Sequence, residues 1–164
     1  MSPKLCTFLT TIFIFVLMVQ PQAMADDHDT DYISVSAGYY DILDDEDAAD
    51  FRFEYRSGDA FFWKIKPWAG AEVTSDASLW VGAGILADIA LTDSLYFVPN
   101  FGAGYYARGS SELDLGAAIE FRSQVELAYE FENDSRLGVS FGHLSNASIS
   151  DRNPGTEVLS LYYH

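Results

Sequence analysis

The sequence is poor in cysteine, histidine and basic residues, and each shortage argues against a class of protein. Its single cysteine, Cys6, lies in the apolar N-terminal segment, so no disulfide framework is expected in the rest of the chain. The three histidines form no cluster with cysteine, which leaves no basis for a zinc site. Nine Lys and Arg stand against 25 Asp and Glu, giving a net charge of −16. This balance argues against a nucleic-acid partner and against electrostatic capture of an anionic surface.

Long apolar runs are also scarce, and the one that occurs is N-terminal. Lys4 precedes an apolar stretch over residues 5–19, and Ala23-Met24-Ala25 then offers a cleavage site before Asp26. The stretch is short for a membrane-spanning helix and has the flanks of a secretory signal peptide. We therefore expect residues 1–25 to be a cleaved signal peptide and residues 26–164 to form a single domain. An uncleaved anchor is the alternative.

Acidic residues are concentrated in two runs, residues 26–31 and residues 41–50. Runs of one charge usually form solvated ends and loops, and this is the interpretation adopted for both. Binding of divalent cations that bridge lipopolysaccharide phosphates is the alternative. Neither run has the complete spacing of an EF-hand loop, so no metal ligand is assigned.

The rest of the chain alternates between apolar and charged residues. In residues 50–56, Phe51, Phe53 and Tyr55 fall on one face of an extended strand, and arginine and glutamate fall on the other. Turn signals rich in Gly, Ser, Asp and Asn divide the chain into eight such strands. These are residues 32–42, 50–56, 63–66, 79–91, 95–107, 115–131, 136–145 and 156–164.

Eight alternating strands behind a signal peptide fit a small closed barrel. A membrane barrel turns its apolar residues outward, whereas a lipocalin-like barrel or a β-sandwich turns them inward, and periodicity alone does not separate the two. The 12 Phe, 10 Tyr and 3 Trp favour the membrane barrel. We predict an all-β fold, an eight-stranded antiparallel transmembrane β-barrel. An even number of strands leaves both termini in the periplasm and places residues 146–155 outside the cell.

The last two strands carry the side chains of greatest chemical interest. Residues 146–155 are rich in turn formers, so the flanking strands form a β-hairpin. His143 and Ser145 share one face because they are two residues apart. A turn centred near Ser150 places Glu157 opposite His143, on that same face. A hydroxyl, an imidazole and a carboxylate on one surface are the components of a Ser-His-acid triad.

These residues belong to a longer pattern at fixed spacing. The run His143-Leu-Ser-Asn-Ala147 is followed by Asn153-Pro-Gly-Thr-Glu157 and by a short final strand that is rich in aromatic residues. The pattern resembles the PagL family, the lipid A 3-O-deacylases of Gram-negative outer membranes. The close match begins near Phe141, and the preceding chain agrees as Gly- and aromatic-rich strands such as residues 98–106. One departure is the last residue, His164, where members of the family end on an apolar or aromatic residue. Tyr163 then carries the assembly signal.

The resemblance implies a function and a role for each residue. It implies a serine esterase that modifies lipopolysaccharide by hydrolysing the 3-O-linked acyl chain of lipid A, with no cofactor and no metal. Ser145 is implied as the nucleophile, His143 as the general base and Glu157 as the carboxylate that orients the imidazole. Asn153 is the expected oxyanion donor, with a backbone N–H near residues 147–148 as the second. Asn146 either supports the oxyanion or orients the loop.

The neighbours of the triad in the alternation are apolar, and this indicates the kind of substrate. They are Leu137, Val139, Phe141, Leu159, Leu161 and Tyr163. The triad face is therefore the lipid face of a membrane barrel. Polar groups facing hydrocarbon are costly and normally functional, so the expected substrate is an ester in the outer leaflet.

Partners and alternatives follow from the same reasoning. The expected partners are lipid A within lipopolysaccharide, the outer membrane, and the barrel-assembly machinery during biogenesis. The oligomeric state is left open, with a homodimer as one alternative. The competing functions are a non-catalytic structural or adhesin barrel, and an outer-membrane phospholipase or acyltransferase that uses the same triad.

Overall fold

The computed structural model describes residues 30–44 and 48–164, so the expected signal peptide lies outside the described residues. The described part of the chain contains strands, and none of its segments is a helix long and apolar enough to cross a membrane. The strands are β1 (Tyr32–Tyr40), β2 (Ala48–Arg56), β3 (Ile65–Thr74), β4 (Leu79–Ala87), β5 (Ile89–Ala90), β6 (Leu95–Ala107), β7 (Ile119–Glu130), β8 (Arg136–Ser145) and β9 (Thr156–Tyr163).

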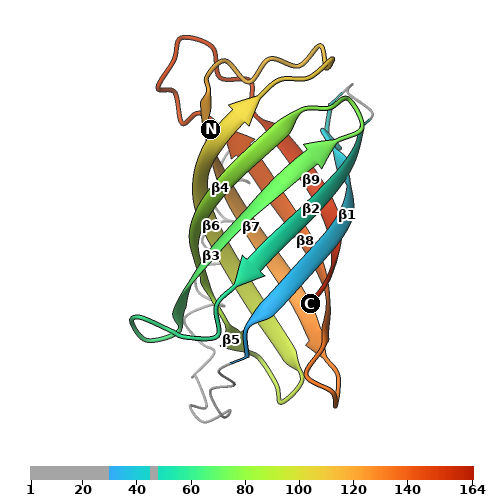
Figure 1. Ribbon diagram of the computed structural model, residues 1–164, viewed down its shortest axis with the longest axis vertical. Helices are drawn as coiled ribbons and strands as arrows, with labels where there is room; N and C mark the ends of the chain where they lie inside the picture. Colours follow the sequence, from blue (N-terminus) through green and yellow to red (C-terminus); the bar gives the residue numbers. More distant parts are fainter. Residues whose placement is uncertain (1–29, 45–47) are drawn as a thin grey trace, which may run out of the picture.

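The strands form a closed antiparallel barrel (Figure 1). Strands adjacent in the chain pair with each other, except that β4 pairs with β6 and not with β5, and β1 closes the circle by pairing with β9. Both β4 and β5 pair with β6 in one continuous register, so they are two parts of a single strand interrupted at Asp88. With β4 and β5 counted as one, the barrel has eight strands, which confirms the predicted fold class.

Some predicted strand boundaries are confirmed and others are wrong. The strands at residues 95–107 and 136–145 have the predicted bounds. The third strand was predicted at residues 63–66, but it spans Ile65–Thr74, and Trp63 lies in the preceding turn with a φ of 51°. The strand predicted from residue 115 begins at Ile119, because Leu115 is instead fully buried in a loop. The other differences are of a few residues at strand ends, apart from the break at Asp88.

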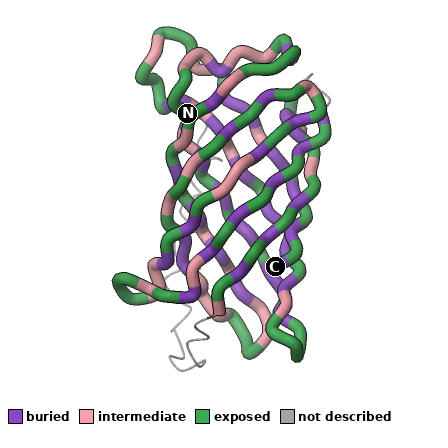
Figure 2. Tube along the Cα trace, viewed as in Figure 1, coloured by how far each residue is buried: buried purple, intermediate pink, exposed green. Residues whose placement is uncertain are grey.

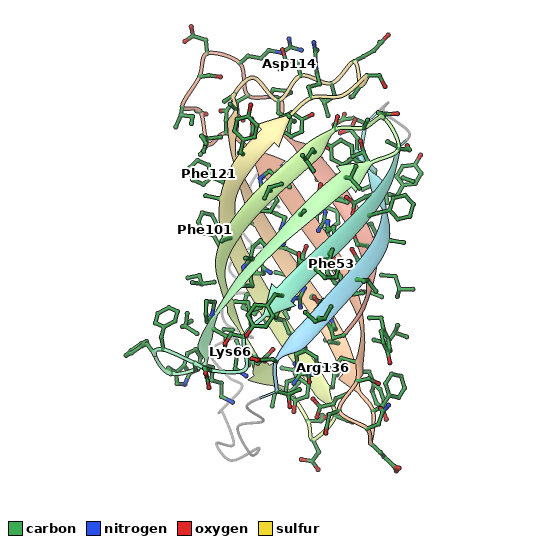
Figure 3. The ribbon with its side chains drawn as sticks, in the orientation of Figure 1. Phe53, Lys66, Phe101, Asp114, Phe121 and Arg136 are labelled. Carbon is green, nitrogen blue, oxygen red and sulfur yellow. The ribbon has the colours of Figure 1, made fainter. Side chains whose placement is uncertain are left out.

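Buried and exposed residues alternate along the strands (Figure 2), which indicates that side chains point in turn to the interior and to the outer wall. On β2, Phe51 and Phe53 are 51% and 57% exposed, whereas Arg52 and Glu54 are buried. In Figure 3, Phe53, Phe101 and Phe121 extend away from the wall of the barrel. An apolar exterior around a charged interior is the arrangement of a membrane barrel and the reverse of a lipocalin. The predicted outward face of residues 50–56 is confirmed.

The interior is held by ion pairs and by stacking of cations on aromatic rings. Arg52 Nε lies 2.9 Å from Asp50 and 3.0 Å from Glu72. The Arg122 guanidinium lies 4.2 Å from the centre of the Trp68 ring. Buried charges are costly unless they are paired. Arg52 pairs within β2 and with β3, and Arg122 pairs with Glu54 and Glu72 across the interior. The interior of the barrel is thus filled by side chains from several strands.

The last residue of the chain also points inward. His164 Nδ1 lies 2.7 Å from Ser34 Oγ, and its Nε2 lies 2.8 Å from Glu126. Tyr163, by contrast, is 52% exposed on the outer wall, which is the face predicted for it. The terminal histidine is thus part of the interior network, and the outward aromatic residue is the one before it.

The two ends of the barrel differ. At the loop end, defined by residues 108–118 and 146–155, the two loops lie against each other above the barrel (Figure 1). Ser150 Oγ donates to Gly116 O at 3.0 Å, and Arg152 pairs with Asp114 at 3.4 Å. At the turn end, the strands are joined by residues 57–64, 91–94 and 131–135. The predicted catalytic hairpin therefore reaches the loop end with a second loop packed beside it.

Candidate active site

The β8–β9 hairpin pairs His143 directly with Glu157. This is the register predicted from a turn centred near Ser150. In an antiparallel sheet, opposed residues project to the same face, and the two side chains meet there. His143 Nδ1 lies 2.9 Å from Glu157 Oε1. The imidazole therefore has one nitrogen engaged by a carboxylate, which leaves Nε2 as the nitrogen available for proton transfer.

The pair lies on the outer wall. The His143 side chain is 40% exposed and that of Glu157 is 22% exposed. Its neighbours of the same parity along the two strands are all exposed apolar residues: Leu137, Val139, Phe141, Leu159, Leu161 and Tyr163. The hydrogen-bonded pair thus lies at the upper edge of an apolar surface and has few polar neighbours on that surface.

Ser145 is the last residue of β8 and shares the face of His143. It is half-buried, and its pairing partner on β7 is Phe121. Its hydroxyl makes no hydrogen bond with any residue that the structure describes. Catalytic hydrogen bonds are often loose without substrate and tighten only when it binds. The structure therefore places Ser145 and His143 on one face of β8, without a hydrogen bond between them.

Asn146 is fully buried and holds the loop together. Its side-chain amide donates to Leu115 O at 2.9 Å and to Arg152 O at 2.7 Å. Its side-chain oxygen accepts the Ser148 N–H at 2.9 Å. Because the amide is engaged within the loop frame, this geometry favours the loop-orienting role that was one of its two predicted alternatives.

Asn153 is the other predicted asparagine, and it is less constrained. Its side-chain oxygen accepts the Asn146 N–H at 3.0 Å. Its amide nitrogen makes one long bond, 3.4 Å, to the Ser148 hydroxyl on the exposed side of the loop. One N–H of this amide thus stays available to an additional acceptor.

The backbone just after Ser145 adopts an uncommon conformation. Ala147 and Ser148 both have positive φ, 52° and 64°. Two successive non-glycine residues in this region are strained, and such strain is concentrated at functional sites. The Ser148 N–H is taken by Asn146, whereas the Ala147 N–H has no hydrogen-bond partner among the described residues. Ala147 is therefore the freer backbone donor of the two predicted positions.

Gly155 lies against the His143 imidazole, a contact that the sequence did not predict. Its φ of 72° lies in the left-handed region, which favours glycine. In addition, a Cβ at this position would lie 2.6 Å from His143 Cε1 and 3.1 Å from Nε2. Any side chain at residue 155 would displace the ring from its place beside Glu157. The glycine in the sequence pattern was the available signal, but it did not identify the contact.

Gly155→Ala is expected to lower the turnover number by on the order of 10²-fold, because a displacement of about 1 Å at a reacting group has an effect of that size. Gly142→Ala is the matched control on the same hairpin, since its Cβ would meet its neighbours at an ordinary 3.5 Å. Initial rates of ester hydrolysis measure both variants. Equal, near-normal rates in the two variants would contradict the inference that the absence of a side chain at residue 155 keeps the His143 ring in place.

No group of three or more His, Cys, Asp or Glu side chains that could hold a metal ion occurs within residues 30–44 and 48–164. Parts of the two acidic runs, residues 26–29 and 45–47, lie outside the described residues.

Comparison with known proteins identifies relatives of this chain. Residues 88–164 match the family model of lipid A 3-O-deacylase (PagL). The lipid A deacylase PagL of Bordetella bronchiseptica is 28% identical over 72 residues, which are 43% of this chain and 40% of that relative. The crystal structure of the outer membrane enzyme PagL superposes with a TM-score of 0.61 and 20% identity, over 82% of this chain and 97% of that one. The resemblance to the PagL family is confirmed.

The structural matches concern the fold. A designed transmembrane β-barrel also superposes, with a TM-score of 0.56 and 13% identity over 85% of this chain and 98% of that one. The fold is thus that of a transmembrane β-barrel, as predicted. All five predicted site residues lie in the part that matches the PagL family: His143, Ser145, Asn146, Asn153 and Glu157.

Proposed function

We propose that this chain is a lipid A 3-O-deacylase, a serine esterase that hydrolyses the 3-O-linked acyl chain of lipid A. The observation that carries the proposal is the 2.9 Å pair of His143 and Glu157 on the outer wall, with Ser145 on the same face. A structural or adhesin barrel has no evident use for a paired imidazole and carboxylate beside an exposed apolar surface. The match to the PagL family supports the choice of ester.

The reaction follows from the roles of three side chains. Ser145 Oγ attacks the acyl carbonyl while His143 Nε2 accepts its proton, and a tetrahedral oxyanion forms. The intermediate collapses to an acyl-serine ester, and the imidazolium gives its proton to the departing sugar hydroxyl. Water then attacks the acyl-enzyme by the same steps and releases a fatty acid. Glu157 holds the ring in the productive tautomer and stabilises its charged form.

The oxyanion requires donors that are already in place. We assign them to the Asn153 amide and to the Ala147 N–H, which are the two groups near Ser145 with hydrogen-bonding capacity to spare. Each such donor contributes roughly 3–4 kcal/mol to the stability of the transition state. Asn146 acts indirectly by holding both residues in the loop.

The position of the site supports a membrane lipid as substrate. An outward-facing polar cluster beside apolar wall residues would be costly in lipid unless it served the lipid itself. With the loop end outside the cell, the site lies at the level of the outer leaflet, where lipid A resides. An ester bond near the sugar headgroup then reaches Ser145 without leaving the membrane.

Incubation of the purified, folded protein with lipid A tests this function. The expected product is the 3-hydroxy fatty acid from the 3 position, identified by mass spectrometry, with heat-unfolded protein as the control. Release of a different acyl chain, or release from phospholipids, would indicate the phospholipase or acyltransferase alternative. No released acid from the folded protein would favour a non-catalytic barrel.

The export pathway gives a separate prediction. We expect the protein isolated from outer membranes to begin at Asp26, since residues 1–25 have the features of a cleaved signal peptide. The intact mass of the isolated protein measures this directly. Retention of residues 1–25 would instead support the uncleaved anchor.

A further inference from the structure

The turn between β2 and β3 contains three adjacent aromatic residues whose side chains are exposed. Phe61, Phe62 and Trp63 are 66%, 73% and 63% exposed, and Lys64 follows them. We call residues 61–64 the aromatic turn. They do not belong to the barrel wall, because β3 begins at Ile65.

The aromatic turn is ordered by its own hydrogen bonds. The Phe61 N–H donates to Ile65 O at 3.0 Å, and the Ile65 N–H donates to Phe62 O at 2.9 Å. Trp63 takes the positive φ that this tight reversal requires. At the base of the turn, the Gly58 N–H donates to Asp31 at 2.8 Å. The backbone of the aromatic turn is thus ordered by these bonds, and the three rings project from it.

The turn differs in place and composition from its neighbours. It stands out sideways from the barrel near the start of β3, at the end opposite the candidate active site (Figure 1). The other two turns at that end each have one exposed apolar residue, Leu91 and Phe131, and are otherwise polar, with Asp93 in one and Glu132 and Asp134 in the other. Because the turn projects sideways, its rings lie beside the outer wall of the barrel. A turn that pointed along the barrel axis would place the rings in water.

Charge points to the same surroundings. Among the described residues at the turn end, the cations of the strands are buried: Arg56, Lys66 and Arg136. Lys66 and Arg136 are labelled at this end in Figure 3 and share Asp88 as partner, at 3.3 Å and 3.1 Å. Lys64 is only half-buried and has no such ion pair. A single accessible cation beside three aromatic rings matches a lipid interface, where rings lie at headgroup level and lysine reaches phosphate.

We propose that the aromatic turn is a lipid anchor that inserts into the headgroup region of the phospholipid leaflet at the turn end. Trp63 and the two phenylalanines lie among the upper acyl carbons, and Lys64 contacts lipid phosphate. The anchor fixes how deeply the barrel sits, and hence the level of the residues at its opposite end. This inference rests on the membrane barrel and not on ester hydrolysis.

Fluorescence of Trp63 tests the anchor, since the other two tryptophans, Trp68 and Trp80, are 2% and 1% exposed inside the barrel. The purified protein is reconstituted in vesicles of phosphatidylethanolamine and phosphatidylglycerol, and the spectrum of Trp63→Phe is subtracted. We expect bromine near the headgroup end of the acyl chains to quench Trp63 by about twofold or more, and bromine near the chain ends or aqueous iodide to quench it less. Quenching by iodide alone would place the turn in water. Shielding from all quenchers would place it against protein, such as a second copy. Either result overturns the proposal.

Lys64→Glu reverses the charge at residue 64 and tests the phosphate contact. Arg108→Glu makes the same change at the loop end and is the matched control. In the wild-type protein and in Arg108→Glu, adding phosphatidylglycerol to neutral vesicles is expected to reduce quenching of Trp63 by acrylamide, a neutral quencher that an anionic surface does not repel. In Lys64→Glu, adding phosphatidylglycerol is expected to have no such effect, because the anionic headgroups repel the introduced carboxylate. An equal response of all three proteins would contradict the role of Lys64.

Discussion

Ser145→Ala is expected to abolish release of the 3-O-linked acyl chain while leaving the barrel folded. The hydroxyl is the proposed nucleophile, and loss of a triad nucleophile lowers turnover by on the order of 10³-fold or more. The side chain lies on the outer face, outside the interior network, so assembly does not depend on it. The rate of acyl release measures the first effect, and the different gel mobility of heated and unheated protein measures the second.

Ser140→Ala is the matched control for this variant. Ser140 is on the same strand but faces the interior, where it is buried. Ser140→Ala should retain wild-type activity, because the hydroxyl that this substitution removes is remote from the outer face. His143→Ala should reproduce the loss seen in Ser145→Ala. Wild-type activity in both Ser145→Ala and His143→Ala would refute the proposed chemistry.

Glu157→Ala is expected to lower turnover by on the order of 10³- to 10⁴-fold, the range seen for the orienting acid of other triads. The 2.9 Å contact with His143 Nδ1 is lost, so the ring no longer favours the productive tautomer. Glu157→Asp should retain part of the activity because the carboxylate survives on a shorter stem. The effect should fall mainly on kcat, since Glu157 acts through the imidazole.

The double variant Ser145→Ala/Glu157→Ala should be no slower than Ser145→Ala alone, because triad members act as a unit. Asp151→Ala removes an exposed carboxylate from the same loop and is the control for a general loss of charge. Single-turnover rates separate the chemical step from binding. Near-normal turnover in Glu157→Ala would leave a Ser-His dyad and exclude the triad.

The barrel and the register of its last hairpin could be predicted because both depend on short-range pattern. Alternation with a period of two assigns Phe53 and Arg52 to opposite faces whatever the rest of the chain does. In the same way, a turn centre near Ser150 is sufficient to pair His143 with Glu157. These relations need only neighbouring residues and the geometry of an antiparallel strand.

The remaining features depend on contacts between distant segments. Leu115 continues an apolar run and was assigned to a strand, but it turns inward and is buried, and its carbonyl accepts the Asn146 amide. Nothing near residue 146 signals a partner 31 residues away. Trp63 was assigned to a strand by alternation, whereas local hydrogen bonds place it in a turn. The contact between Gly155 and the His143 ring likewise forms only when the hairpin loop closes, so the local sequence does not predict it.

The most direct test of the proposed function is the mass spectrum of lipid A from cells that contain the wild-type protein, the Ser145→Ala variant or neither. We predict that wild-type cells alone contain lipid A lighter by one 3-hydroxyacyl chain, lost from the 3 position. Cells with Ser145→Ala should match cells without the protein, although the variant is present in their outer membranes. Identical lipid A in all three would contradict the proposal that this barrel is a lipid A deacylase.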